Sequence, residues 1–178
     1  MTRWLRFYYD LCLLKAAPQD APVSKNAFYT ALFVYLLVGT SITLFNQGLA
    51  VSVIVASLQA IIFIFITNLV MWVKKTPERF LQTVTSLLGT GALIAMVAIP
   101  VVYLGTSTTP GAESSATVSF LWMISILIIV WETVVIGNIL RHAMEIPLLA
   151  GVGVALIYMY LSFAVTLRIV KVMSFPME

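Results

Sequence analysis

The sequence predicts an all-α, polytopic membrane protein in which an N-terminal amphipathic helix precedes five transmembrane helices. Composition is the first reason, because 61% of the 178 residues are hydrophobic and only 10% are charged, against about 25% charged in soluble domains. The second reason is that the apolar residues form five continuous stretches, each near the ~20 residues that a spanning helix needs. Hydrocarbon offers no partner for free backbone groups, and the runs lack the alternation of barrel strands, so we expect helices.

A single five-helix transmembrane bundle, residues 27–178, is expected to account for most of the chain. The linkers between the apolar stretches are too short to hold a separate folded domain. The expected spans are residues 27–45, 49–73, 80–104, 118–140 and 146–167.

Residues 1–26 are expected to form an interfacial amphipathic helix and a turn on the cytoplasmic side. Read at helical spacing, aromatic and aliphatic side chains share one face of this helix, and basic side chains lie on another. Such a mixture suits the headgroup region of a bilayer. The expected membrane-interface residues are Trp4, Phe7, Tyr8, Leu11, Arg3 and Arg6. The pattern predicts either a lipid-facing anchor, which we favour, or a helix that docks on a partner protein.

The distribution of Lys and Arg predicts the orientation in the membrane. Eight of the ten basic residues lie before span one, between spans two and three, or between spans four and five. The other two, Arg168 and Lys171, follow span five. Because basic residues are retained on the cytoplasmic side, we expect a cytoplasmic N-terminus and an external C-terminus. The net charge of +3 records this bias, and the scattered basic residues do not predict nucleic-acid binding.

Glu132 is the deepest charged residue of the five spans. It precedes Arg141 by nine residues, which places it about 13 Å inside the cytoplasmic end of its helix. A carboxylate at that depth costs at least ~2.5 kcal/mol, so we expect a neutral Glu132 that is hydrogen-bonded to hydroxyl or backbone groups. Residues at the same depth on the first three spans are the expected partners. The expected intramembrane polar site is Glu132, Tyr35, Thr67, Ser86 and Thr90.

Two interpretations compete for Glu132. It is either a proton carrier or cation ligand, or a polar contact that holds helices together at about 1 kcal/mol. We favour the structural contact, because proton pathways usually contain several ionisable residues and here only one lies deep in a span.

Small residues in spans three and five predict close approaches between helices. Their spacing of about four residues aligns them on one helix face, which allows backbones to come close. The expected helix-packing residues are Gly89, Gly91, Ala95, Gly151 and Ala155.

Enzymatic chemistry finds little support in the sequence. His142 is the only histidine and Cys12 the only cysteine. A metal site needs three or four converging ligands, and His142 with Glu145 supplies two at most. We therefore expect no metal and no cofactor, and a salt-bridged helix end formed by Arg141, His142 and Glu145.

The layout of the chain resembles the bacterial Yip1-like (Yip1 domain) membrane proteins. The likeness lies in a short lead with a proline-rich turn, five spans, and a basic connection into Phe80-Leu81-Gln82-Thr83 with Gly89 a little further on. It covers about residues 18–167. The resemblance implies a bundle in a bacterial inner membrane that organises membranes or partner proteins, as eukaryotic relatives do with trafficking GTPases. The polar motifs of those relatives are not evident here, so no functional residue is carried over.

The function expected from these observations is a non-enzymatic membrane scaffold or accessory subunit that binds other membrane proteins or itself. The contact surfaces would be the small-residue positions and the N-terminal segment. The alternative is a small transporter or a proton-coupled channel component that uses Glu132.

Overall fold

The computed structural model describes residues 2–21, 23–107 and 116–174, and the regular structure in these ranges is entirely helical. The long helices are α2 (Lys25–Leu44), α3 (Leu49–Lys74), α4 (Phe80–Thr106), α5 (Ala116–Met144) and α6 (Leu148–Ser174). The short elements are α1 (Thr2–Cys12), η1 (Pro18–Asp20) and η2 (Pro77–Arg79). Within these described ranges, five helices are long and apolar enough to cross a membrane. The prediction of an all-α, five-span protein is therefore confirmed.

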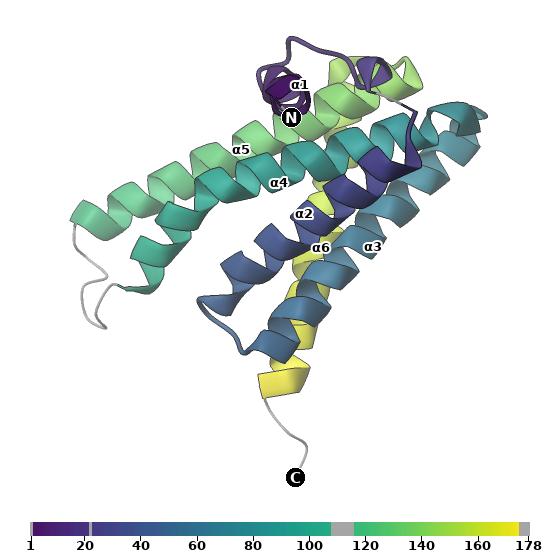
Figure 1. The fold of residues 1–178 in the computed structure, drawn as a ribbon. Coiled ribbons are helices and arrows are strands. Elements are labelled where there is room, and N and C mark those ends of the chain that lie inside the picture. The colour runs from purple at the N-terminus through teal and green to yellow at the C-terminus, as the bar shows by residue number, and fades with distance from the viewer. Residues whose placement is uncertain (1, 22, 108–115, 175–178) are drawn as a thin grey trace.

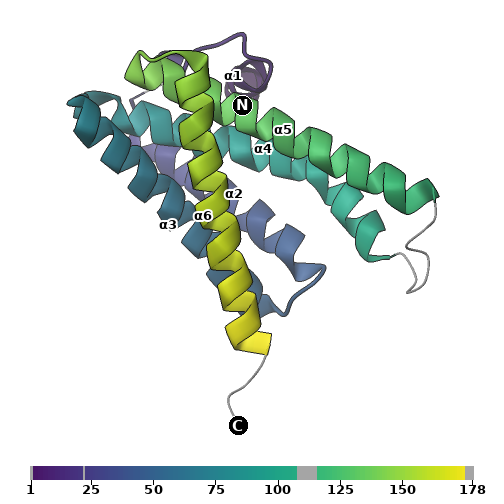
Figure 2. The same cartoon turned by 180° about the vertical axis from the view of Figure 1, so that it is seen from behind.

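The long helices converge at the end of the molecule that carries α1 and separate toward the opposite end (Figure 1). We call the first of these the α1 end. α2 packs against α3 and α4, α4 packs beside α5, and α6 packs against α5 and α3. Seen from behind, α6 crosses α5 near the α1 end and then runs alongside α3 (Figure 2). Residues 96–106 and 116–130, in the halves of α4 and α5 far from α1, form a two-helix arm that diverges from α3 and α6, while its Tyr103 ring still meets the Phe45 ring at the end of α2 with centroids 5.5 Å apart.

The core of the protein lies near the α1 end. α4 is buried over the continuous run 83–92, and α5 is buried over residues 135–140. A helix can be buried on all sides only where neighbours surround it, and α4 contacts α1, α2, α3 and α5. In the arm, by contrast, most large apolar side chains are exposed. These side chains face lipid when the helices span a bilayer.

Three helices terminate at the α1 end with the same backbone geometry. Leu14, Lys75 and Glu145 have φ angles of 61°, 58° and 55°, in the left-handed region that glycine usually occupies. In each case the N–H of the next residue donates to the carbonyl five positions back, as from Thr76 to Met71 at 3.0 Å. These bonds satisfy carbonyl groups that a helix end otherwise leaves free.

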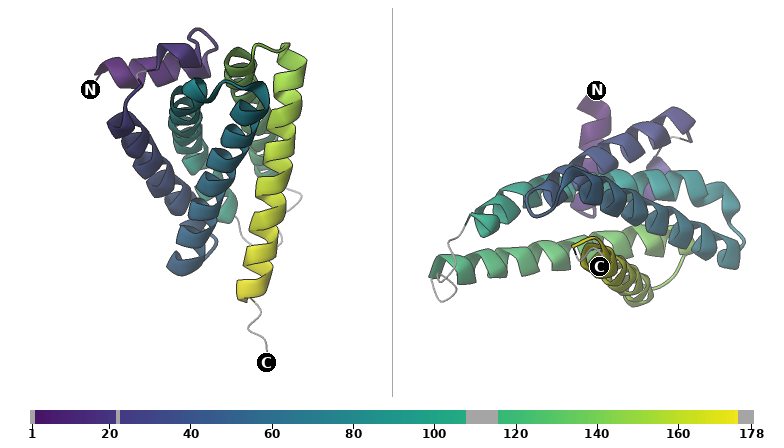
Figure 3. Two further views of the ribbon diagram at one scale, coloured as in Figure 1. Left: turned by 90° about the vertical axis from the view of Figure 1, so that its right-hand side faces the viewer. Right: turned by 90° about the horizontal axis from the view of Figure 1, so that it is seen from below.

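Residues 2–21 cover the α1 end as a docked cap. α1 lies across the ends of the long helices (Figure 3), and its Leu11 is fully buried. The Trp131 indole N–H donates to the Cys12 carbonyl at 2.9 Å. The Gln82 amide donates to the carbonyls of Gln19 and Ala21 at 3.0 and 2.9 Å. These bonds tie the segment to α4 and α5.

An ion pair links the two turns at the α1 end. Arg79 Nη2 lies 2.7 Å from Glu145 Oε1, and Arg79 Nη1 donates to the Ala143 carbonyl at 3.4 Å. From the sequence we instead expected Glu145 to pair within its own helix end, with Arg141 and His142. That expectation was wrong because α5 ends at Met144, so Glu145 leaves the helical spacing and turns toward the neighbouring connection.

Candidate functional site

Glu132 lies on α5 where aromatic side chains from other helices approach it. Tyr35 of α2 and Tyr158 of α6 are both buried. Their hydroxyl groups interact with each other, and both side chains interact electrostatically with the Glu132 carboxyl group. The structure thus brings Glu132 together with Tyr35, which the sequence placed at the same depth in the membrane.

An aromatic stack joins the two tyrosines. The ring of Phe63 from α3 stacks on Tyr158 with centroids 3.8 Å apart and an interplanar angle of 24°. The Tyr35 ring lies edge-on to the Phe63 ring, with centroids 5.8 Å apart and an interplanar angle of 80°. Edge-to-face and offset stacked pairs are the favoured arrangements of aromatic rings. Four helices, α2, α3, α5 and α6, therefore meet around Glu132.

The other hydroxyl groups expected near Glu132 are occupied within their own helices or remain unpaired. Thr67 Oγ1 donates to the Phe63 carbonyl at 2.7 Å, and Thr90 Oγ1 donates to the Ser86 carbonyl at 2.8 Å. The Ser86 hydroxyl is buried and has no hydrogen-bond partner in the described part of the chain. Bonds of this local kind are common for Ser and Thr inside helices. These three residues do not converge with Glu132 through hydrogen bonds.

The carboxyl group of Glu132 makes no hydrogen bond or ion pair within residues 2–21, 23–107 and 116–174. The expected hydrogen bond to a hydroxyl or backbone group is thus not formed in this conformation. The carboxyl group nevertheless interacts electrostatically with the phenol groups of Tyr35 and Tyr158. Burial of such a group inside a membrane helix is costly and marks a site where function is worth testing.

Tyr158 was not selected from the sequence. The residues expected at the depth of Glu132 were chosen only from spans one to three, by counting from the cytoplasmic end of each span. The same count along span five reaches Tyr158, which lies ten residues after Leu148, the first residue of α6. The fifth helix must return across the same depth, so the signal was present in the sequence.

The expected packing residues lie at close contacts inside this chain. A Cβ atom on Gly89 would collide with the Tyr8 ring, and one on Gly151 would collide with the Gly137 carbonyl oxygen. A Cβ atom on Gly91 would lie 3.1 Å from the Tyr35 ring, its nearest neighbour. Ala155 is fully buried and Ala95 is half-buried.

Gly137 is a packing residue that the sequence did not lead us to select. A Cβ atom there would lie 2.9 Å from both the backbone N and the Cα of Val152. Gly137 and Gly151 therefore mark the point where the backbones of α5 and α6 touch. Thr133 lies four residues before Gly137, so a small-residue spacing was present in this span, but only the pairing of α5 with α6 shows what Gly137 contacts.

Some of the residues expected at the membrane interface pack against the rest of the protein, and others are exposed. Leu11 is buried, Phe7 and Tyr8 are half-buried, and Trp4 and Arg6 are exposed. The side chain of Arg3 lies outside the described residues. α1 thus packs its Tyr8 and Leu11 side on the bundle, which differs from the lipid-facing anchor that we favoured from the sequence.

The potential metal ligands do not converge. Within the described residues, no group of three or more His, Cys, Asp or Glu side chains could hold a metal ion. The Nδ1 atom of His142 lies 2.8 Å from the Asn138 carbonyl oxygen in its own helix. Cys12, the last residue of α1, is buried, and this burial raises the pKa of its thiol to about 11.

Comparisons with family models, with curated proteins and with solved structures found no match to this chain.

Proposed function

We propose that this protein is a non-enzymatic membrane scaffold or accessory subunit that binds other membrane proteins or a second copy of itself. The observation that carries the proposal is the two-helix arm. Among its exposed side chains, Trp122 is 67% and Leu127 is 60% exposed. Helices of a membrane bundle associate mainly by packing, so an arm with free faces offers helix surface to a partner.

The exposed residues of α5 form a broad apolar face on the arm. On α5 they are Phe120, Trp122, Met123, Ile126, Leu127, Ile129 and Val130. At a helical repeat of 3.6 residues, these positions form one continuous face that covers about half of the helix. A partner helix could therefore pack on this face of α5.

The small-residue positions are less suitable as partner surfaces. Gly89 and Gly151 already contact other parts of this chain, and α1 covers the bundle with its buried side. The proposed contact surface therefore moves from the positions that the sequence suggested to the arm.

Photocrosslinking from the arm tests the proposal. A photoreactive amino acid at Trp122 in the arm should yield adducts with one defined integral membrane protein or with a second copy of this chain. The same residue at Trp72, which is 74% exposed on α3 near the α1 end, is the matched control. Only lipid adducts at position 122, or identical protein adducts at both positions, would contradict the proposal.

The proposed setting is a bacterial inner membrane, with the N-terminus in the cytoplasm and the C-terminus in the periplasm. The excess of Lys and Arg at the α1 end supports this orientation. The five-span layout agrees with the resemblance to the Yip1-like proteins, and that likeness is the basis for the bacterial assignment.

The cluster of Glu132, Tyr35 and Tyr158 supports a second candidate, a small transporter or proton-coupled channel component. Flux measurements in vesicles separate the two functions. If Glu132→Gln leaves the protein folded but abolishes proton or solute flux of the wild type, transport is favoured. If neither protein carries flux while the arm adducts persist, the scaffold proposal stands.

A further inference from the structure

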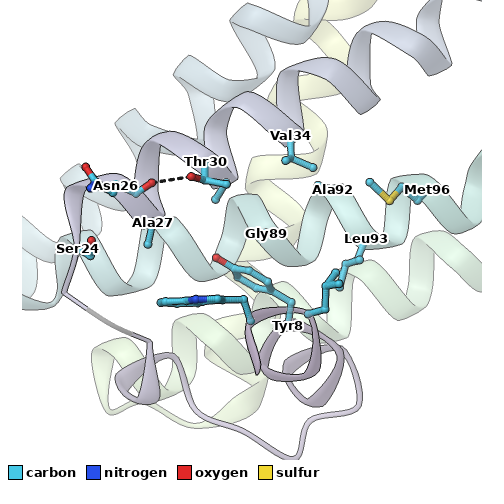
Figure 4. Close-up of a pocket in the computed structure, with 13 residues that line it drawn as sticks. Tyr8, Ser24, Asn26, Ala27, Thr30, Val34, Gly89, Ala92, Leu93 and Met96 are labelled. Carbon is cyan, nitrogen blue, oxygen red and sulfur yellow. Dashed lines mark hydrogen bonds between the residues drawn. The ribbon is translucent and has the colours of Figure 1, made fainter. Parts of the chain in front are cut away.

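A pocket of about 460 Å³ lies between α1, the first half of α2 and the middle of α4. Its volume falls within the ~300–1,000 Å³ typical of ligand sites. Tyr8 projects from α1 toward Gly89 and forms one wall (Figure 4). The close approach of this ring is possible because Gly89 has no side chain. The pocket is thus built by the docking of α1 on the bundle.

The lining of the pocket changes from polar to apolar with depth. Ser24, Asn26 and Thr30 lie at the start of α2, and Val34 lies further along the same helix (Figure 4). On α4, which runs in the same direction, Leu93 and Met96 continue the apolar part. The polar side chains of the lining therefore lie at the α1 end, together with Trp4, Leu5 and Tyr8 of α1, and the part toward the middle of the membrane is apolar.

The length of the pocket matches one leaflet. From Ser24 to Val34 the chain advances ten residues, or about 15 Å along a helix. The hydrocarbon core of a bilayer is about 30 Å thick, so one leaflet contributes about 15 Å. A ligand that fills this pocket would extend from the headgroup boundary to near the midplane.

The mostly apolar lining suits an acyl chain, which is the apolar group that surrounds the protein on this side. Its polar headgroup would lie beside Ser24 and Asn26.

Charge at the polar end favours an anionic headgroup. Lys25 is an exposed residue at the rim, next in the chain to Ser24 and Asn26, although it does not itself line the pocket. A second hollow of about 540 Å³ adjoins the first across Leu5 and Leu93, and its lining includes Arg6 as well as Asp10. Basic side chains near a membrane surface attract anionic lipids by about 1 kcal/mol each.

We propose that this pocket binds one acyl chain of an anionic phospholipid from the leaflet at the α1 end. The polar residues at the start of α2 hold the headgroup region, and Lys25 supplies the preference for negative charge. This binding site does not depend on the scaffold function.

Photoactivatable phosphatidylglycerol tests the site in the intact protein. The protein is reconstituted in vesicles of phosphatidylcholine that contain a phosphatidylglycerol with a photoreactive acyl chain. Adducts should concentrate at Leu93 and Met96, at least fivefold above those at Phe65, an exposed α3 residue. Unlabelled phosphatidylglycerol should compete for the pocket adducts better than unlabelled phosphatidylcholine.

Filling the pocket provides the decisive comparison. Ala27→Trp places an indole in the pocket and should reduce the pocket adducts at least fivefold without changing those at Phe65. Ala150→Trp, at an exposed position at the start of α6, should change neither. Val34→Trp repeats the test from the deep end if Ala27→Trp does not fold. Pocket adducts equal to those at Phe65, or unchanged by a folded filling variant, would overturn the site.

The headgroup preference is tested separately. Lys25→Gln should make the two unlabelled lipids equal competitors, whereas Lys74→Gln, at an exposed position at the end of α3, should preserve the preference. Equal competition in the wild type, or a preference that survives Lys25→Gln, would overturn the assignment of an anionic headgroup.

Discussion

Gly89 determines how closely α1 can approach the bundle. The Tyr8 ring occupies the space in which any larger residue would place its Cβ atom. Leu11 and Cys12 follow Tyr8 by about one helical turn and are also buried. A change at a single position of α4 should therefore alter the environment of α1 as a whole.

Gly89→Ala should displace α1 and expose Cys12, the only thiol of the chain. Overpacking of this kind typically costs about 1–3 kcal/mol, and the ring can escape only if α1 moves. Burial now raises the pKa of Cys12 to about 11 from its ordinary value of 9.0. In the variant the pKa should fall, because the thiolate regains water.

The rate of thiol alkylation as a function of pH measures this change. Wild-type labelling should stay slow until the pH nears 11, and the variant should react at lower pH, because the thiolate is the reactive form. Gly153→Ala is the control, since nothing lies within 4 Å of its Cβ position. Identical pH profiles for Gly89→Ala and wild type would show that α1 does not rest on Gly89.

Gly151 is the second position where a methyl group has no room. Its neighbour is the carbonyl oxygen of Gly137, which cannot yield as a flexible side chain can. Gly151→Ala should lower the free energy of unfolding by about 1–3 kcal/mol. Gly153→Ala should raise it by up to about 1 kcal/mol, because alanine favours the helix. Denaturant unfolding in detergent measures both, and a shift of the same sign would refute the proposed crossing point.

The ends of the helices, at the scale of the elements, hold backbone strain. Lys75 adopts a left-handed conformation at the end of α3, which costs a residue other than glycine about 1–2 kcal/mol. The residues on either side of Lys75 do not share this conformation. Lys74 is the last residue of the helix, and the Thr76 N–H donates to the Met71 carbonyl. Glycine should therefore have opposite effects at positions 74 and 75.

Lys75→Gly should stabilise the protein by about 0.5–1 kcal/mol, after part of the relieved strain is offset by the greater freedom of the unfolded chain. Lys74→Gly should destabilise it by up to about 1 kcal/mol. The two variants have the same charge, so electrostatic effects are closely matched. Unfolding free energies in the same detergent test the pair, and a destabilised Lys75→Gly protein would contradict the expected relief of strain.

The sequence predicted the spans better than their surroundings. The fourth expected span, 118–140, lies within α5 (Ala116–Met144), because hydropathy registers the apolar centre of a helix and not its polar ends. The helix at the N-terminus was also expected. Its docking was not, because an apolar face such as that of Tyr8 and Leu11 has the same pattern whether it meets lipid or protein.

The candidate site could be predicted in part for similar reasons. Counting residues from the cytoplasmic end of each span places Tyr35 at the level of Glu132, because every helix advances by the same rise per residue across the same bilayer. It cannot show which way a side chain turns at that level. Thr67 and Thr90 have the right depth, but they bond to carbonyls of their own helices. Rotation of each helix about its axis decides this, and long-range packing sets that rotation.

At the scale of the whole molecule, each of the five spanning helices has its two ends on opposite sides of the membrane, so successive connections alternate between the two sides. In a Cys12→Ser background, Lys74→Cys and Gln47→Cys should therefore differ in their access to a membrane-impermeant thiol reagent added outside cells. With the proposed orientation, position 47 should react and position 74 should react only after the membrane is permeabilised. Equal reactivity in intact cells would contradict the five-span topology.

The contact between Gly137 and Gly151 lies close to one end of α6, so a rotation at this contact moves the other end of the helix most. The contact is three residues after the start of α6, and 23 residues remain to Ser174, or about 35 Å. A tilt of α6 by about 10° at this contact would displace its C-terminal end by roughly 6 Å. Because the Gln59 amide donates to Thr166 Oγ1 at 3.3 Å, α3 would travel with it. A small rotation between two glycines would thus widen or narrow the angle between the arm and its neighbours.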